Sequence, residues 1–170
     1  MQMPVAKKIL DAMGIKHYEI DNYEADDIIG TLSKRAYIDP DFEALIVSSD
    51  KDLLQLINEE IEVKCLKSKD YIRYNVNTFK EEYGFDPIRI IDLKALMGDA
   101  SDNIPGVKGI GEKTAIKLIR EYDTIENLYE HIDDIGGKLK EKLVDDKESA
   151  FFSKKIATIY LDVPIEDNLE

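Results

Sequence analysis

The sequence predicts an α/β fold followed by a purely helical region. Short apolar runs rich in β-branched residues alternate with amphipathic helical patterns in the first part of the chain, which is typical of βα units. From Gly98 onward no strand pattern of any length follows. The 170 residues are 44% hydrophobic and 35% charged, a composition that indicates a globular chain with a real core. We therefore expect a partial parallel sheet with flanking helices over residues 1–97 and a helical region over residues 98–170.

The chain opens with a predicted helix instead of a strand. Pro4 suits an early helical position and Gly14 a helix end, so the pattern predicts a helix over Met3–Met13 and then a short strand over Ile15–Ile20. An α/β chain usually places its first strand early. This unusual opening leads us to expect a further segment before Met1.

Two βα transitions follow. The segment DNYEADDIIGTLSKRA has its apolar residues at helical spacing, with Glu24, Asp26 and Asp27 crowding the first turn. The run Glu43–Ser48 (EALIVS) predicts a buried parallel strand. The residues Ser49-Asp50-Lys51-Asp52 come directly after that strand and are expected to open a helix. The carboxyl end of a strand is where open α/β sheets place ligands.

The remaining elements are read in the same way. The alternating run Ile61–Leu66 predicts a strand, and Tyr71–Tyr74 a short strand that pairs with it as an edge hairpin. Helices are then predicted from periodicity and from their start and stop residues. They cover 77–83, 86–97, 112–122, 124–131, 138–145 and 147–160.

Charge and cysteine content set limits on location and partners. The single Cys65 permits no internal disulfide, and no apolar run reaches the ~20 residues of a membrane span, so we expect a cytoplasmic protein without membrane contact. The formal net charge is -13. Net charge does not decide what binds, however, because acids gathered on one rim can hold divalent cations beside a polyanion.

Acidic residues recur in three close pairs: Glu24 with Asp26, Asp50 with Asp52, and Asp99 with Asp102. Each pair lies at or near a loop that follows a strand or closes a helix, so one sheet rim could carry all three. Mg²⁺ prefers hard oxygen ligands, and two such ions can stabilise the attacking and leaving oxygens of a phosphoryl displacement. The alternative for each pair alone is helix capping, since acids near a helix N-terminus interact favourably with its dipole.

A glycine-rich turn follows the last acidic pair. Its sequence, Gly106–Thr114 (GVKGIGEKT), nearly matches a phosphate-binding P-loop, but Glu112 separates the last glycine from Lys113-Thr114 and no strand precedes it. Nucleotide binding is therefore the weaker interpretation, and a plain connecting turn is another. We favour a tight hairpin that contacts a DNA backbone without reading bases. The residues expected to take part are Gly106, Lys108, Gly109, Gly111, Lys113, Thr114 and Lys117.

Three motifs together resemble a known family. These are YEADD at Tyr23–Asp27, SSDKDLLQL at Ser48–Leu56 and GDASDNIPGVKGIGEKTA at Gly98–Ala115, and they resemble the 5′-nuclease domain of bacterial DNA polymerase I, a member of the flap endonuclease superfamily. The resemblance extends from about Met3 to Val163-Pro164. It implies a PIN-like sheet whose acids bind two divalent metal ions, and a helix-three-turn-helix motif that holds duplex DNA.

The resemblance also implies roles for particular residues. Glu24 and Asp26 would serve one metal ion, and Asp50, Asp52 and Asp102 the other. Asp27 and Asp99 match acids of the wider cluster. Mg²⁺ is the expected cofactor, with Mn²⁺ as a substitute. The segment 106–117 corresponds to the DNA-holding turn and helix, which in relatives also binds K⁺ through backbone carbonyls.

The sequence departs from the family at its front. The family's first strands, with their metal-binding aspartates, and its helical arch of basic phosphate-contacting residues have no counterpart in these 170 residues. We therefore expect weak or absent cleavage with retained affinity for 5′-flap, nicked or 5′-ended duplex DNA. Expected partners besides DNA are a separate N-terminal segment or a polymerase domain of the same gene product. The alternative is a noncatalytic duplex-DNA-binding module whose acids cap helices.

Overall fold

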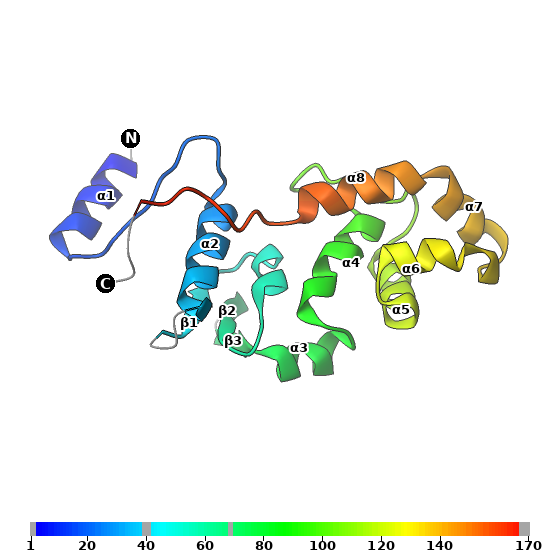
Figure 1. Ribbon diagram of the computed structural model, residues 1–170, viewed down its shortest axis with the longest axis horizontal. Helices are drawn as coiled ribbons and strands as arrows, with labels where there is room; N and C mark the ends of the chain where they lie inside the picture. Colours follow the sequence, from blue (N-terminus) through cyan, green and yellow to red (C-terminus); the bar gives the residue numbers. More distant parts are fainter. Residues whose placement is uncertain (1–2, 39–41, 68–69, 167–170) are drawn as a thin grey trace.

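The computed structural model describes residues 3–38, 42–67 and 70–166, and it begins with an α/β region (Figure 1). The elements of this region are α1 (Met3–Ala12), α2 (Ala25–Ile38), β1 (Ala44–Val47), the 3₁₀ helix η1 (Asp52–Leu56), β2 (Ile61–Lys67) and β3 (Asp70–Tyr74). The three strands form one sheet in the order β1-β2-β3. The first pair is parallel and the second antiparallel, so both the parallel pairing and the edge hairpin are confirmed.

The second region is helical, as predicted. Its elements are α3 (Val76–Tyr83), η2 (Pro87–Arg89), α4 (Ile90–Met97), α5 (Glu112–Tyr122), α6 (Ile125–Glu130), η3 (Ile132–Asp134), α7 (Gly137–Asp145) and α8 (Lys147–Ala157). Local residues set several of the ends. The Asn75 side chain accepts a hydrogen bond from the Thr78 amide in a capping box that starts α3, and Gly84 ends α3 at a φ of 80°.

One hydrophobic core joins the sheet to the helices. Val63 of β2, Phe79 of α3, Leu96 of α4 and Leu128 of α6 are all fully buried members of it. Helix α4 lies at its centre, with every residue from Ile90 to Leu96 buried, and α8 packs along it (Figure 1). The core therefore fixes the loop that leaves the end of α4 relative to the sheet.

Two predicted elements differ in the structure. No strand forms over 15–20; Tyr18 and Ile20 instead pack on α2 as extended chain, because no described strand offers their backbone a ladder. Helix α8 ends at Ala157, not near Tyr160. The amides of Ile159 and Tyr160 donate to side chains of other elements, to Gln55 Oε1 at 3.1 Å and to Asp27 Oδ1 at 2.8 Å, which draws the chain out of the helix.

Strand β1 is less buried than its apolar sequence predicts. Ile46 faces the core, whereas Leu45 and Val47 are 48% and 63% exposed. The prediction of a fully buried strand is therefore wrong for the described residues, since β1 is an edge of this sheet and only one of its faces is covered. None of the described helices is long and apolar enough to span a membrane.

The C-terminal segment crosses back over α2 (Figure 1). Val163 and Ile165 are buried against Ile28 of α2. The Val163 amide donates to Thr31 Oγ1 at 3.1 Å, and Arg35 donates to the Ile165 carbonyl at 2.9 Å. The acids at the start of α2 are thus held in place by residues more than a hundred positions further along the chain.

Candidate metal site and glycine turn

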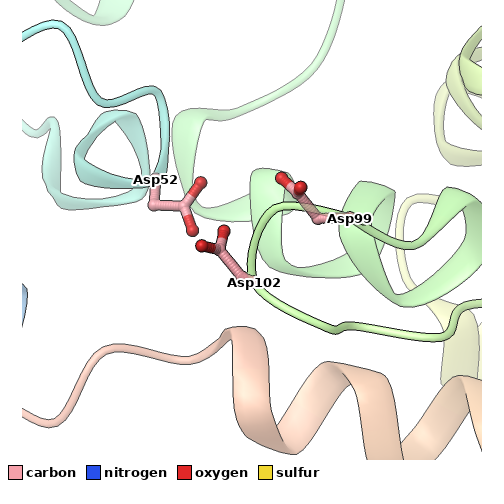
Figure 2. A group of neighbouring side chains, drawn as sticks. All are labelled: Asp52, Asp99 and Asp102. Atoms are coloured by element: carbon pink, nitrogen blue, oxygen red, sulfur yellow. The ribbon is translucent and has the colours of Figure 1, made fainter.

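The structure brings three of the seven predicted acids to one point. Asp52 lies at the start of η1, and Asp99 and Asp102 lie in the loop after α4 (Figure 2). One carboxylate oxygen from each lies within 4.8 Å of the others. Of the three acidic pairs expected on one rim, the cluster thus contains Asp52 and the Asp99/Asp102 pair, whereas Glu24, Asp26 and Asp50 are not part of it.

These acids line a pocket of about 470 Å³. Lys94, Ser101 and Glu112 also line it, beside apolar side chains that include Leu93 and Met97. The remaining charged residues in the lining are Asp50 and Lys51. The pocket therefore has room for a cation with its water molecules and for part of a larger anionic ligand.

Lys94 is the residue that the sequence reasoning missed. Its side chain is only 6% exposed, and Nζ forms ion pairs with Asp52, with Asp99 at 2.9 Å and with Asp102 at 3.4 Å. A visible clue was present, because Asp92 and Lys94 are the two charged residues in the otherwise apolar helix IIDLKALM. A lysine in a helix buried all round needs a negative partner.

The surroundings shift the pKa values of Asp99 and Asp52 in opposite directions. The hydroxyl of Ser101 and the ammonium of Lys94 lower the pKa of Asp99 to about 2. Burial raises the pKa of Asp52, although Lys94 partly offsets it. Burial alone would lower the pKa of Lys94, but its bonds to Asp52 and Asp99 outweigh that effect, and the pKa is raised. The ammonium therefore stays charged in the pocket.

The remaining predicted acids lie at or just before the start of α2 and in the β1–η1 loop. We call all seven predicted acids the acidic region: Glu24, Asp26, Asp27, Asp50, Asp52, Asp99 and Asp102. Burial, followed by the negative charges of Asp50 and Asp52, raises the pKa of Asp26 to about 6. Glu24 and Asp27 contribute smaller effects of the same sign. Because repulsion between carboxylates falls off with distance, these couplings indicate that Asp26 faces the β1–η1 loop. A bound cation would relieve the repulsion.

Two of the acids also make the backbone contacts expected of caps. Asp27 accepts from the Glu24 amide at 3.2 Å and from the Tyr160 amide at 2.8 Å, so each of its oxygens has a partner. Asp50 Oδ1 accepts from the Asp52 amide at 3.0 Å. The capping interpretation thus describes part of what Asp27 and Asp50 do. The second oxygen of Asp50 accepts no hydrogen bond from the described residues and is open to a cation.

The loop from Gly98 to Gly106 connects the acids to the glycine turn through a backbone contact. Asp99 and Ile104 exchange two backbone hydrogen bonds, of 2.9 and 2.8 Å. This closes the loop and brings Gly98 against Gly106, both with positive φ. A Cβ on Gly106 would lie 2.3 Å from the Gly98 nitrogen, so no larger residue fits.

The turn beyond Gly106 presents cations and amides to solvent. Lys108, Lys113 and Lys117 are exposed, Thr114 is half-buried, and none of the three lysines forms an ion pair within the described residues. Helix α5 starts after Gly111 without a side-chain cap. Its first amides therefore lack intrahelical acceptors and suit an anionic oxygen.

The donor set fits a hard divalent cation. Carboxylate oxygens are the preferred ligands of Mg²⁺ and Mn²⁺, and the three clustered acids can converge on one ion if Lys94 moves aside. A carboxylate pocket thus adjoins a turn that presents exposed lysines and helix-start amides.

Both parts of the chain match models of a single family. Residues 1–84 match the N-terminal resolvase-like domain of 5′-3′ exonucleases, and residues 85–170 match their C-terminal SAM fold. The chain belongs to the 5′-3′ exonuclease family.

Relatives of known sequence agree. The chain is 52% identical to DNA polymerase I of Bacillus subtilis over 168 residues, which cover 97% of this chain and 19% of that protein. It is 51% identical to DNA polymerase I of Streptococcus pneumoniae R6 over 172 residues, covering 99% of this chain and 20% of that protein. The chain thus spans about a fifth of the length of these curated relatives.

Solved structures resemble the fold. T5 5′-exonuclease with bound zinc is 25% identical, with a TM-score of 0.74 over 89% of this chain and 55% of that one. A bacteriophage T5 flap endonuclease, solved as a pseudo-enzyme-product complex with DNA and metal ions, is also 25% identical. Its TM-score is 0.72 over 87% of this chain and 54% of that one. The predicted family and α/β-plus-helical fold are confirmed.

Proposed function

We propose that this chain binds duplex DNA through the glycine turn and contributes to metal-dependent hydrolysis of phosphodiesters near 5′ ends in branched or nicked DNA. The observation that carries this proposal is the backbone contact between Gly98 and Gly106. It joins the loop of Asp99 and Asp102 rigidly to the turn, so the distance between held duplex and cation site is fixed. The metal ions and DNA in the T5 flap endonuclease complex support the same assignment.

Each group of residues has a distinct task in this proposal. Asp52, Asp99 and Asp102 would hold one Mg²⁺ or Mn²⁺ ion, and Glu24 with Asp26 would contribute to holding a second. Bound divalent cations supply positive charge that stabilises developing phosphate charge and makes water a better nucleophile. The amides and lysines of α5 hold the DNA backbone. K⁺ would bind backbone carbonyls of the same turn. The Gly109 carbonyl already accepts a hydrogen bond from Lys142, so K⁺ would compete with Lys142 if it bound that carbonyl.

A cleavage assay tests the proposal. We expect a 5′-flap substrate with Mn²⁺ or Mg²⁺ to be cut slowly or not at all by this chain, while duplex binding persists. The reason is that the family's basic arch has no counterpart in the sequence. Any cleavage must vanish in Asp102→Ala. Cleavage that survives this substitution, or absence of duplex binding, contradicts the proposal.

The second candidate function is a noncatalytic duplex-DNA-binding module. The ion pairs of Lys94 favour it, because the ammonium already offsets part of the negative charge of the three acids without metal. Calorimetric titration with Mn²⁺ separates the two candidates. Saturable binding that weakens in both Asp50→Ala and Asp52→Ala supports a metal site, whereas no saturable binding in the unmodified chain supports the module.

A further inference from the structure

The backbone of the glycine turn is held by a row of four polar side chains from the α7–α8 pair: Lys142, Asp146, Ser149 and Ser153. We call them the turn-holding row. Lys142 lies in the last turn of α7, Asp146 between the two helices, and Ser149 and Ser153 one helical turn apart on one face of α8. Together they contact the backbone of the turn.

Gly106 is held at both of its polar groups. Its amide donates to Ser153 Oγ at 2.9 Å, and its carbonyl accepts from Ser149 Oγ at 2.6 Å. Ser153 is fully buried, so this bond is protected from water. Two hydroxyl contacts therefore fix the peptide groups on both sides of the Gly106 Cα, the residue that packs against Gly98.

The rest of the turn is held by charged side chains. Asp146 Oδ2 accepts from the Lys108 amide at 2.7 Å, and Lys142 Nζ donates to the Gly109 carbonyl at 2.9 Å. Asp146 is the residue at which α7 ends and α8 begins, and its side chain does not cap α8. An aspartate at such a position usually accepts from its own helix. Here that interaction is replaced by a contact with the turn.

The contacts leave a particular set of amides for an external ligand. The amides of Gly106, Val107, Lys108 and Ile110 all donate within the chain. A second set of amides finds no acceptor among the described residues, and it comprises those of Gly109, Gly111, Glu112 and Lys113. The turn therefore has one set of amides bonded within the chain and a second set, which we call the outer amides, that lack such partners.

We infer that the turn-holding row is a positioning device for DNA binding: it fixes the turn so that the outer amides are already aimed at a DNA phosphate before DNA arrives. The inference rests on the proposed function of the turn. Preorganised binding groups lose less conformational freedom on association, so loosening the row should weaken binding although the row touches no DNA.

Asp146 gives a test in which electrostatics and positioning predict opposite signs. Removing a negative charge near a DNA-binding surface strengthens binding if only charge matters. If Asp146 positions the turn, Asp146→Ala should instead weaken binding to a fluorescently labelled duplex by about threefold to tenfold. Asp146→Asn keeps an acceptor for the Lys108 amide and should bind at least as tightly as the unmodified chain.

Asp145→Ala is the matched control, because this neighbouring acid is exposed and forms no hydrogen bond or ion pair with the described residues of the turn. It should leave binding unchanged or slightly tighter. Ser149→Ala removes a turn contact without changing charge and should also weaken binding, which keeps the test open if Asp146→Ala fails to fold. If Asp146→Ala or Ser149→Ala folds and binds as well as Asp145→Ala does, the inference is wrong. If the unmodified chain binds no duplex, the proposed function itself fails.

Discussion

The acidic pocket and the glycine turn adjoin one another, yet they are stabilised in opposite ways. Around the turn, backbone groups find neutral or well-matched partners on α7 and α8, and the exposed lysines are left without counter-ions among the described residues. In the pocket, three carboxylates share one ammonium, and outside its lining burial and the charges of the pocket acids Asp50 and Asp52 raise the pKa of Asp26 to about 6. The turn is thus held in place by contacts within the chain although some of its amides lack acceptors, whereas the pocket carries repulsion between carboxylates that further positive charge would reduce.

The largest effect is expected from removing the ammonium that the pocket acids share. Lys94→Met should lower the free energy of unfolding by about 3 kcal/mol without metal, because it leaves partly buried carboxylates uncompensated. Saturating Mn²⁺ should restore more stability to this variant than to the unmodified chain. Urea unfolding with and without Mn²⁺ measures both. Lys117→Ala, at an exposed site, is the control, and equal losses in the two variants would contradict the comparison.

A glycine substitution tests the rigidity of the turn. Gly106→Ala should cost roughly 2 to 3 kcal/mol and weaken duplex binding, because the added carbon meets the Gly98 backbone and φ is positive. Gly136→Ala is the matched control, since a Cβ at that position would meet nothing within 4 Å, its φ is -109° and it lies outside the turn. Thermal unfolding and duplex titration of both variants check the prediction. A tolerated Gly106→Ala would mean that the two loops can separate.

The pH dependence of stability tests the repulsion between Asp26 and the pocket acids Asp50 and Asp52. The pKa of Asp26 is about 6 in the folded chain, against an ordinary value of 3.8. Between these two pH values the folded chain binds more protons at Asp26 than the unfolded chain does. The contribution of Asp26 therefore makes the chain more stable as pH falls through 6. Asp26→Asn should therefore be more stable than the unmodified chain at pH 7, by roughly 1 kcal/mol after solvent screening, and by only about half as much at pH 5. Urea unfolding of both proteins at the two pH values measures the difference.

The same titration should affect metal binding in the opposite direction. Protonated Asp26 offers less charge to a cation, so Mn²⁺ affinity should fall between pH 7 and pH 5. Calorimetry at both pH values measures this fall, and Asp26→Asn should show less of it. An Asp26→Asn variant with unchanged stability and unchanged Mn²⁺ affinity at pH 7 would remove Asp26 from the acidic region.

The smallest effect on stability is expected at the turn's lysines. Lys113→Ala and Lys117→Ala should change the free energy of unfolding by no more than about 0.5 kcal/mol, since both side chains are exposed. Each should nevertheless weaken duplex binding for any DNA sequence and reduce the salt slope by about one unit per lost phosphate contact. Anisotropy titrations across a salt series measure this, and an unchanged slope would exclude the lysine concerned from the interface.

The sequence predicts which acids belong to the site better than it predicts the contacts between side chains there. Asp52, Asp99 and Asp102 can be identified because strand ends and glycine loops leave recognisable local patterns. Lys94 escapes sequence reasoning, because helix periodicity assigns a charged residue to the surface and cannot reveal a buried partner. The contact of Asp146 with Lys108 is equally invisible, since it depends on how two helices pack.

The same limit explains the errors in the fold. The strand predicted over Ile15–Ile20 does not form, although Tyr18 and Ile20 do pack on α2, because a strand also needs a partner that lies elsewhere in the sequence. The end of α8 is set by Gln55 and Asp27, more than a hundred residues away. The division at residue 97 stays a prediction, and the two family models meet at residues 84 and 85.

The return of the C-terminal segment to α2 has a consequence for how the chain acquires its structure. Thr31 and Val163 are 132 residues apart in sequence, so their contact closes most of these residues into one loop. Contacts of such long range form slowly, because the entropy of loop closure is lost before they stabilise anything. During synthesis, the contacts of α2 with Val163 can form only after Val163 has left the ribosome, so this side of α2 should become ordered after the helices between them have packed.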